Sequence, residues 1–271
     1  MEVKNLEFLK KILSIPSYSK KEEMVIEFLC GYCEETGLDY QVDDVGNVFI
    51  TKGKIKKGEF YPLVGAHMDT VHFPEPKEIR EHNGYLSAHN PTTGHQIGIG
   101  GDDLAGVAIA LMVMEALPVC KANFFIAEEI GCVGSKHAAI TNKEFYQNVG
   151  YFIEFDSPED FSISRSNSGV QLFDESGDFF TRTKPILQEA MGSKMKLFDH
   201  PHTDTAPIKA NFDFTCINVA AGYFGWHSSR EIVSIDFVEK ARVMGIKMCQ
   251  ELGLNKFHWV DNNLKQANYW F

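Results

Sequence analysis

The sequence lacks the basic surplus and the long apolar runs of nucleic-acid-binding and membrane proteins. Its 26 lysines and arginines are outnumbered by 37 aspartates and glutamates, so its formal net charge is −11. This acidity argues against binding to nucleic acids or anionic membranes, because both favour basic surfaces. The longest apolar stretch, residues 107–117, is interrupted by Glu115 and is too short to span a bilayer. We therefore expect no nucleic-acid partner and no membrane partner.

Cysteine is sparse, and no secretory leader is recognisable. Six cysteines in 271 residues are far too few for a disulfide-based fold. The first residues, MEVKNLEFLKKIL, contain no uninterrupted apolar run. These features predict a cytoplasmic protein in a reducing compartment. Cys30 and Cys33 form a CxxC pair inside a predicted amphipathic helix with no second pair, so we expect them to pack in the core.

The apolar residues that are present predict an α/β protein. Helical spacing is found over residues 4–14, about 19–35, 107–117, 183–191 and 235–252. Strands are expected over residues 41–51, 60–66, 124–127, 150–155 and 214–220. Ser17 or Ser19 is expected to cap the helix that ends before Gly37. The alternation favours a three-layer α/β/α sandwich with a mostly parallel, mixed central sheet, in a single domain over residues 1–271.

Histidines and acidic residues follow the apolar segments at the points where strands are expected to end. The residues placed in this way are His67, Asp69, Glu128, Glu129, Asp156 and His227, while Asp102 and Asp103 lie between GIGIGG and an apolar helix. Each of them alone has an ordinary structural explanation, such as a helix cap or a turn. Together they indicate a ligand site, because the carboxyl ends of strands in open α/β sheets form the binding edge.

The chemistry of this set favours metal ions. Imidazole and carboxylate ligands without sulfur suit zinc, cobalt or manganese. Two histidines and three carboxylates, one of them bridging, could hold two ions. Glu128 and Glu129 could divide the work, one as ligand and one as proton shuttle. Asp69 could accept the imidazole N–H of His67 and orient that ring.

Five motifs in order resemble those of the co-catalytic dizinc exopeptidases. They are GAHMDTV, GGDDLAGVAIA, AEEIGCVGS, FD at 155–156 and GWHSSRE. The clan includes peptidase T-like tripeptidases, carboxypeptidase G-like enzymes and dizinc aminopeptidases. The resemblance covers nearly the whole chain and implies the same α/β fold and two zinc ions.

The resemblance also implies a role for each motif residue. His67 and Asp156 would bind the first metal, Glu129 and His227 the second, and Asp102 would bridge both. Glu128 would be the general base, and Asp69 would support His67. Relatives often have a cis peptide after the bridging aspartate. HTDTAPI at 202–208 is similar to a segment of single-domain aminopeptidases, which places His202 and Asp204 near the substrate.

The implied activity is peptide-bond hydrolysis by an aminopeptidase or small-peptide exopeptidase. The alternatives are a deacylase of N-acyl amino acids and, in a different class, a non-catalytic binding protein of the same fold. The intervals between the motifs are too short for the inserted lid domain of many relatives. We therefore expect two loops, His72–Gly100 and Ser157–Phe180, to wall the pocket instead. The motifs do not specify the oligomeric state.

Overall fold

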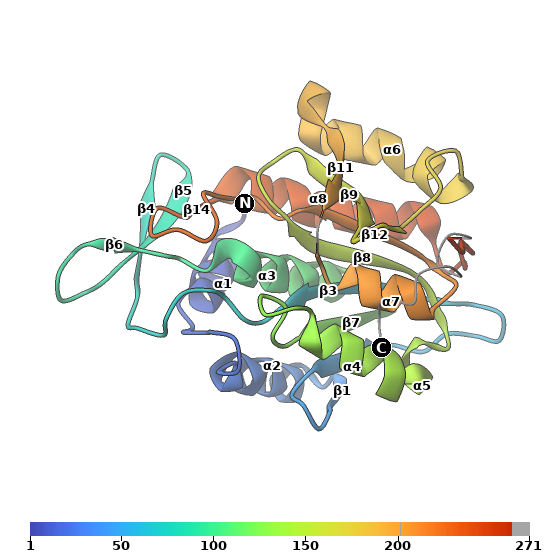
Figure 1. Ribbon diagram of the computed structural model, residues 1–271, viewed down its shortest axis with the longest axis horizontal. Coiled ribbons are helices and arrows are strands. Elements are labelled where there is room, and N and C mark those ends of the chain that lie inside the picture. The colour runs from blue at the N-terminus through green and yellow to red at the C-terminus, as the bar shows by residue number, and fades with distance from the viewer. Residues whose placement is uncertain (201, 262–271) are drawn as a thin grey trace.

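The computed structural model describes residues 1–200 and 202–261, which form two β-sheets and a set of helices (Figure 1). The helices are α1 (Val3–Leu13), α2 (Glu23–Thr36), α3 (Gly101–Ala116), α4 (Val133–Thr141), α5 (Lys143–Tyr146), α6 (Asp178–Met191), α7 (Thr205–Asn211) and α8 (Ile235–Leu252). The larger sheet contains β1 (Asp39–Val42), β2 (Val48–Lys52), β3 (Tyr61–His67), β7 (Cys120–Phe125), β8 (Val149–Ser157), β9 (Ser162–Asn167), β10 (Val170–Gln171), β11 (Lys196–His200) and β12 (Thr215–Ala220). The smaller sheet contains β4 (Glu78–His82), β5 (Tyr85–His89), β6 (Gln96–Ile97), β13 (Tyr223–Phe224) and β14 (Ile232–Ser234).

The larger sheet is mixed, with a parallel centre. Its order is β1-β2-β7-β3-β8-β12-β9-β10, and β11 pairs with β9. The four central strands β7, β3, β8 and β12 run parallel, whereas β2 and β9 join them antiparallel. Every residue of these four strands is buried, as expected for parallel strands covered on both faces.

Helices cover both faces of this sheet and complete the predicted three-layer sandwich. On one face, α3 packs against the sheet and also against α1 and α8. Its residues from Gly101 to Met114 are all buried, because a helix that is apolar all round must be enclosed. On the other face, α4 packs against α7, and Tyr146 of α5 contacts Asn123 of β7. The predicted α/β/α architecture is therefore confirmed.

The segment after His67 differs from the prediction. Residues 72–101 were expected to be a long loop, but they contain β4, β5 and β6. The turn between β4 and β5 is Asn83-Gly84, with φ values of 49° and 82°. An Asn-Gly pair with positive φ is the usual two-residue hairpin turn, so the signal was present in the sequence. The resulting hairpin pairs with β14 and lies at one end of the molecule in Figure 1.

The predicted cap of α2 is also wrong. The helix begins at Glu23 after Glu22, and no side chain caps it. Ser17 and Ser19 instead donate hydrogen bonds to Met68 O at 2.5 Å and to Asp69 Oδ2 at 2.6 Å. The two hydroxyls are used across the fold because the segment before α2 runs beside the end of β3.

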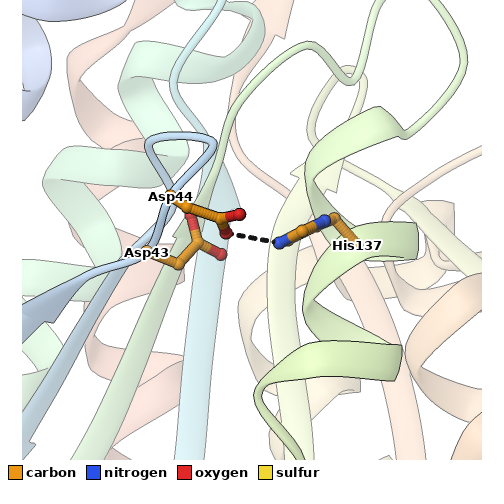
Figure 2. Close-up of side chains that lie close together, drawn as sticks. All are labelled: Asp43, Asp44 and His137. Atoms are coloured by element: carbon orange, nitrogen blue, oxygen red, sulfur yellow. Dashed lines mark hydrogen bonds and ion pairs between the residues drawn. The ribbon is translucent and has the colours of Figure 1, made fainter.

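The turn between β1 and β2 is braced against α4. Asp43 Oδ1 accepts hydrogen bonds from the three backbone N–H groups of residues 45–47. Asp44 Oδ1 lies 2.8 Å from His137 Nε2 on α4, as Figure 2 shows. Asn47 then accepts from the backbone N–H of Ile126, two residues before Glu128. This corner of the fold therefore holds the segment that leads into the acidic pair Glu128–Glu129.

None of the described helices is long and apolar enough to cross a membrane.

Gly245 of α8 packs so closely against its neighbours that a larger residue there is expected to destabilise the fold. A Cβ atom there would lie 2.7 Å from the Phe155 ring and 2.9 Å from a Val113 methyl group. We expect Gly245→Ala to lower the free energy of unfolding by about 1–3 kcal/mol through overpacking. The control is Gly31→Ala in α2, where a Cβ would meet nothing within 4 Å. Urea denaturation should show a gain of about 0.5–1 kcal/mol for the control, and equal effects of the two substitutions would contradict the packing.

Candidate functional site

The carboxyl ends of the central strands meet at one edge of the larger sheet. β3 ends at His67, β8 carries Asp156 near its end, and α3 begins at the same edge with Asp102. Glu128 and Glu129 follow β7, and His227 lies between β13 and β14. A cavity of about 390 Å³ opens there. Its lining contains Asp102, Glu128, Glu129, Gly131, Asp156, Pro158, His200, His202, Thr203, Tyr223, Trp226 and His227.

His67 is buried at the end of β3, with carboxylates on both sides of its ring. Its Nε2 lies 3.1 Å from Asp102 Oδ1 and 3.4 Å from Asp156 Oδ1. Its Nδ1 lies 3.0 Å from the backbone oxygen of Asp69 and 3.3 Å from Asp69 Oδ1. Burial alone would lower the pKa of His67, but the three surrounding carboxylates raise it well above its usual value.

His227 reaches Asp102 from the other side. Its Nε2 lies 3.0 Å from Glu129 Oε2 and 3.3 Å from Asp102 Oδ2. The hydrogen bond to Asp102 is the main cause that raises the pKa of His227 to about 9. Burial would raise the pKa of Asp102, but its hydrogen bonds to His227 and His67 lower it to about 2. Asp102 thus places one carboxylate oxygen beside each histidine.

Asp69 holds the backbone of the neighbouring acidic pair. Its Oδ1 accepts from Glu128 N at 2.9 Å, and its Oδ2 accepts from Glu129 N at 3.2 Å and from Ser19 Oγ. Burial would raise the pKa of Asp69, but its contact with His67 lowers it. Asp69 is therefore a link between the loop that carries the two glutamates and the ring of His67.

Glu128 differs from Glu129 in its surroundings. Glu129 lies against His227, and burial, followed by the charge of Asp102, raises its pKa to about 8. Glu128 lines the cavity, and the hydrogen bond from Cys132 Sγ at 3.4 Å reaches its Oε1. Burial raises the pKa of Glu128 well above its usual value. Both glutamates line the cavity, but Glu129 is hydrogen-bonded to a histidine and Glu128 is not.

The donor set fits metal ions. His67, Asp102 and Glu129 each offer one ligand atom within 4.8 Å of the others. The contacts of the two histidines with the carboxylates span 3.0 to 3.4 Å. Ligand atoms around a tetrahedral zinc are separated by about 3.3–3.6 Å, so only small shifts are needed. No Lys or Arg is among the described residues that line the cavity, and so many buried carboxylates call for cations.

Two further acidic groups have the spacing of metal ligands but are already engaged. Asp103 lies near His67 and Asp156. Its carboxylate accepts from the backbone N–H groups of His67 and Gly106, each at 3.2 Å, so it ties β3 to α3. The Asp102–Asp103 peptide bond is cis, as the resemblance implied. The surface group Asp43, Asp44 and His137 is the brace already described, and Asp43 Oδ1 is saturated by backbone donors.

His202 and Asp204 separate in the structure. His202 lines the cavity, and its Nδ1 lies 3.1 Å from Ser168 Oγ. Asp204 is fully buried and does not line the cavity. Its Oδ1 accepts a short hydrogen bond from Ser135, while burial raises its pKa to about 8. Its place is behind the site, not in it.

The expected walls of the pocket are mostly wrong. No described residue of His72–Gly100 lines the cavity, because the hairpin of this segment pairs with β14 and lies elsewhere. Ser157–Phe180 contributes only Pro158. The walls come instead from His200, His202 and Thr203 and from the segment that contains Tyr223 and Trp226.

Two residues next to Asp156 were missed. Tyr223 donates a hydrogen bond to Asp156 O at 3.0 Å, and Asn218 Oδ1 accepts from Asp156 N at 2.9 Å. Asn218 is the one amide in the buried strand TCINVA, which was a usable signal. Tyr223 had a weaker one, its position in the short segment between that strand and His227.

Comparison with known proteins shows the family. A model of peptidase family M28 matches residues 47–230. A curated protein of Pyrococcus furiosus, described as a "putative LysW-lysine/LysW-ornithine hydrolase", is 43% identical over 82 residues. That match covers 30% of this chain and 23% of the relative, so it spans less than a quarter of that protein.

Solved structures show the same fold at low identity. Aminopeptidase PepT from Bacillus cereus matches with a TM-score of 0.75 and 15% identity, over 92% of this chain and 98% of that chain. Aminopeptidase APDkam598 from the archaeon Desulfurococcus kamchatkensis matches with a TM-score of 0.72 and 14% identity, over 93% and 95%. The family match spans more than half of the chain and includes all the candidate site residues. This chain therefore belongs to peptidase family M28, a family of metal-dependent peptidases, in agreement with the five motifs.

Proposed function

We propose that the protein is an exopeptidase that uses two zinc ions, with cobalt or manganese as substitutes. His67, Asp102 and Asp156 would hold one ion, and Asp102, Glu129 and His227 the other. The observation that carries this proposal is the position of Asp102, with Oδ1 3.1 Å from His67 Nε2 and Oδ2 3.3 Å from His227 Nε2. A carboxylate between two histidines is the arrangement that a bridging ligand needs.

The bound ions would act as Lewis acids and would lower the pKa of a bound water molecule to about 7. Glu128 would accept the proton of the attacking water and return it to the leaving amine. Its position at the cavity, with no histidine against it, supports this role over that of a ligand. Asp69 would keep Glu128 and Glu129 in place through their backbone N–H groups.

The cavity favours an aminopeptidase over the alternatives. Carboxypeptidase substrates and N-acyl amino acids carry a free carboxylate, which needs a cationic partner. The described cavity lining includes no Lys or Arg that could pair with such a carboxylate. Small peptides are therefore the proposed substrates, with His202 as a contact and Asp204 buried behind the cavity against Ser135. Deacylation of N-acyl amino acids remains the second candidate, since the motifs of the site are shared by that class.

The cellular setting and domain organisation are also proposals. The six cysteines are free thiols, which supports a reducing, cytoplasmic compartment. We propose that residues 1–271 form one catalytic domain. The smaller sheet supports this, because β13 and β14 flank His227.

Glu128→Gln is expected to lose activity and keep its metal. The amide is nearly isosteric but cannot accept a proton, and general-base catalysis is typically worth about 10²–10⁴-fold. Turnover of a peptide substrate should fall by that factor, while elemental analysis gives the wild-type metal content. Near-normal turnover would show that Glu128 is not the base. Loss of metal would instead make Glu128 the ligand and Glu129 the base.

Glu129→Gln should separate charge repulsion from metal binding. In chelator-treated protein its thermal midpoint should match or exceed that of the wild type, because the neutral amide avoids the cost of burying a carboxyl group whose pKa the site raises to about 8. Zinc at about 1,000 times its Kd should stabilise the wild type by about 4 kcal/mol, and the variant by much less. Glu35→Gln, at an exposed position near the end of α2, is the control and should keep the full gain. An equal gain in Glu129→Gln would remove Glu129 from the ligand set.

A substrate panel should distinguish the aminopeptidase, the deacylase and the non-catalytic binding protein from one another. Amino acid p-nitroanilides and N-acetyl amino acids are assayed side by side, with and without added zinc. We expect zinc-dependent release from the p-nitroanilides because the amino terminus is free. Cleavage of the N-acetyl compounds alone would favour the deacylase, and no cleavage of either would favour the non-catalytic protein.

A further inference from the structure

Glu231 is a fully buried carboxylate that lies four residues after His227 and belongs to none of the proposed ligand sets. It ends the loop that carries His227, just before β14. A carboxylate enclosed in this way needs strong hydrogen bonds to offset its lost hydration. The donors that reach it identify what it does.

Three donors converge on this carboxylate. Oε1 accepts from Asp102 N at 2.9 Å. Oε2 accepts from Gly100 N at 2.8 Å and lies 2.8 Å from His72 Nε2. The backbone N–H of Glu231 also donates to Ser228 O at 3.2 Å, which closes the turn after His227.

The contacts of Glu231 hold the irregular segment that leads into α3. Gly100 has a φ of 73° and no side chain, and neither Asp102 (φ −82°, ψ 98°) nor Asp103 (φ −124°, ψ 30°) is helical. The N–H groups of Gly100 and Asp102 therefore lie before the regular turns of the helix and need an acceptor from elsewhere. Glu231 supplies that acceptor from a position 129 residues from Asp102 along the chain.

His72 extends the same clamp to β3. It lies five residues after His67, and its ring packs against Gly98, where a Cβ would lie 2.1 Å from the imidazole. A side chain at position 98 would therefore push His72 away from Glu231. The segments that follow His67, precede Asp102 and follow His227 are thus joined at one carboxylate.

We infer that Glu231 is a positioning residue for the metal centre, which holds the backbone of Asp102 between the two histidines. This inference rests on the proposed function, because it assumes that Asp102 is a metal ligand. Outer partners of metal ligands typically contribute 10–100-fold to metal affinity. Glu231 acts on the backbone of a ligand, not on its side chain, and it does not line the cavity.

The test is Glu231→Gln, whose amide N–H₂ would face an N–H group of the clamp and could not accept from it. Zinc affinity, measured by competition with a chromophoric chelator, should weaken by about 10–100-fold. Leu187→Ala in α6 is the matched control, since Leu187 is fully buried but remote from the site. It should lower the thermal midpoint of the metal-free protein and leave zinc affinity unchanged.

Wild-type zinc affinity in Glu231→Gln would overturn the inference, and so would a loss of affinity in Leu187→Ala that matches the loss of stability. His72→Ala removes one of the three donors to Glu231 and serves as the test if Glu231→Gln does not fold. It should weaken zinc binding less than tenfold, and unchanged affinity would contradict the positioning role.

Asp102→Asn tests the proposed function separately. If Asp102→Asn binds zinc like the wild type, the ligand assignment fails, whereas a loss there with none in Glu231→Gln rejects only the positioning role.

Discussion

Repulsion among buried carboxylates at the carboxyl edge of the larger sheet is the constraint on which the rest of the structure depends. The parallel strands β7, β3, β8 and β12 bring their ends together, so acidic residues distant in sequence become neighbours. Burial and mutual charge raise the pKa of Glu128, Glu129 and Asp156. His67 and His227 contact these carboxylates, and each also has a raised pKa. An edge of this kind is stable when cations occupy it, which links folding to metal binding.

The acidic residues fall into two layers that the geometry keeps apart. In the outer layer, Asp102, Glu128, Glu129 and Asp156 face the cavity. In the inner layer, Asp69, Asp103 and Glu231 accept backbone N–H groups that lead into the outer layer. Glu22 does the same for Ala127, whose φ of 52° precedes the acidic pair. The inner carboxylates therefore fix the backbone, and the outer ones are left free to bind.

The residues of the site that were predicted are mainly those that lie at the carboxyl ends of strands. The structure brings His67, Asp102, Glu129, Asp156 and His227 together, as their positions at strand ends and, for Asp102, at the start of an apolar helix had indicated. The helices over residues 3–13, 23–36 and 235–252 were predictable from their periodicity. Asn218 and Tyr223 were missed because neither is a metal-ligand type, although both contact the backbone and the carboxylate of Asp156. Asp204 was expected near the substrate together with His202, and its side chain is buried away from the cavity that His202 lines.

The prediction that residues 72–100 wall the cavity failed because the Asn-Gly turn inside this segment forms a hairpin instead. Residues 72–100 begin and end beside proposed ligands, which suggested a flap over the metals. Both ends are anchored away from the cavity, however, by His72 at Glu231 and by Lys77, whose Nζ donates to Ile99 O at 2.9 Å. Burial lowers the pKa of Lys77 to about 8, in keeping with an enclosed position. Between these anchors the Asn-Gly turn forms a hairpin that pairs with β14, and the cavity is left to Trp226 and His202. Since β14 directly follows the loop that carries His227, the pairing that draws the hairpin away from the cavity also braces that loop.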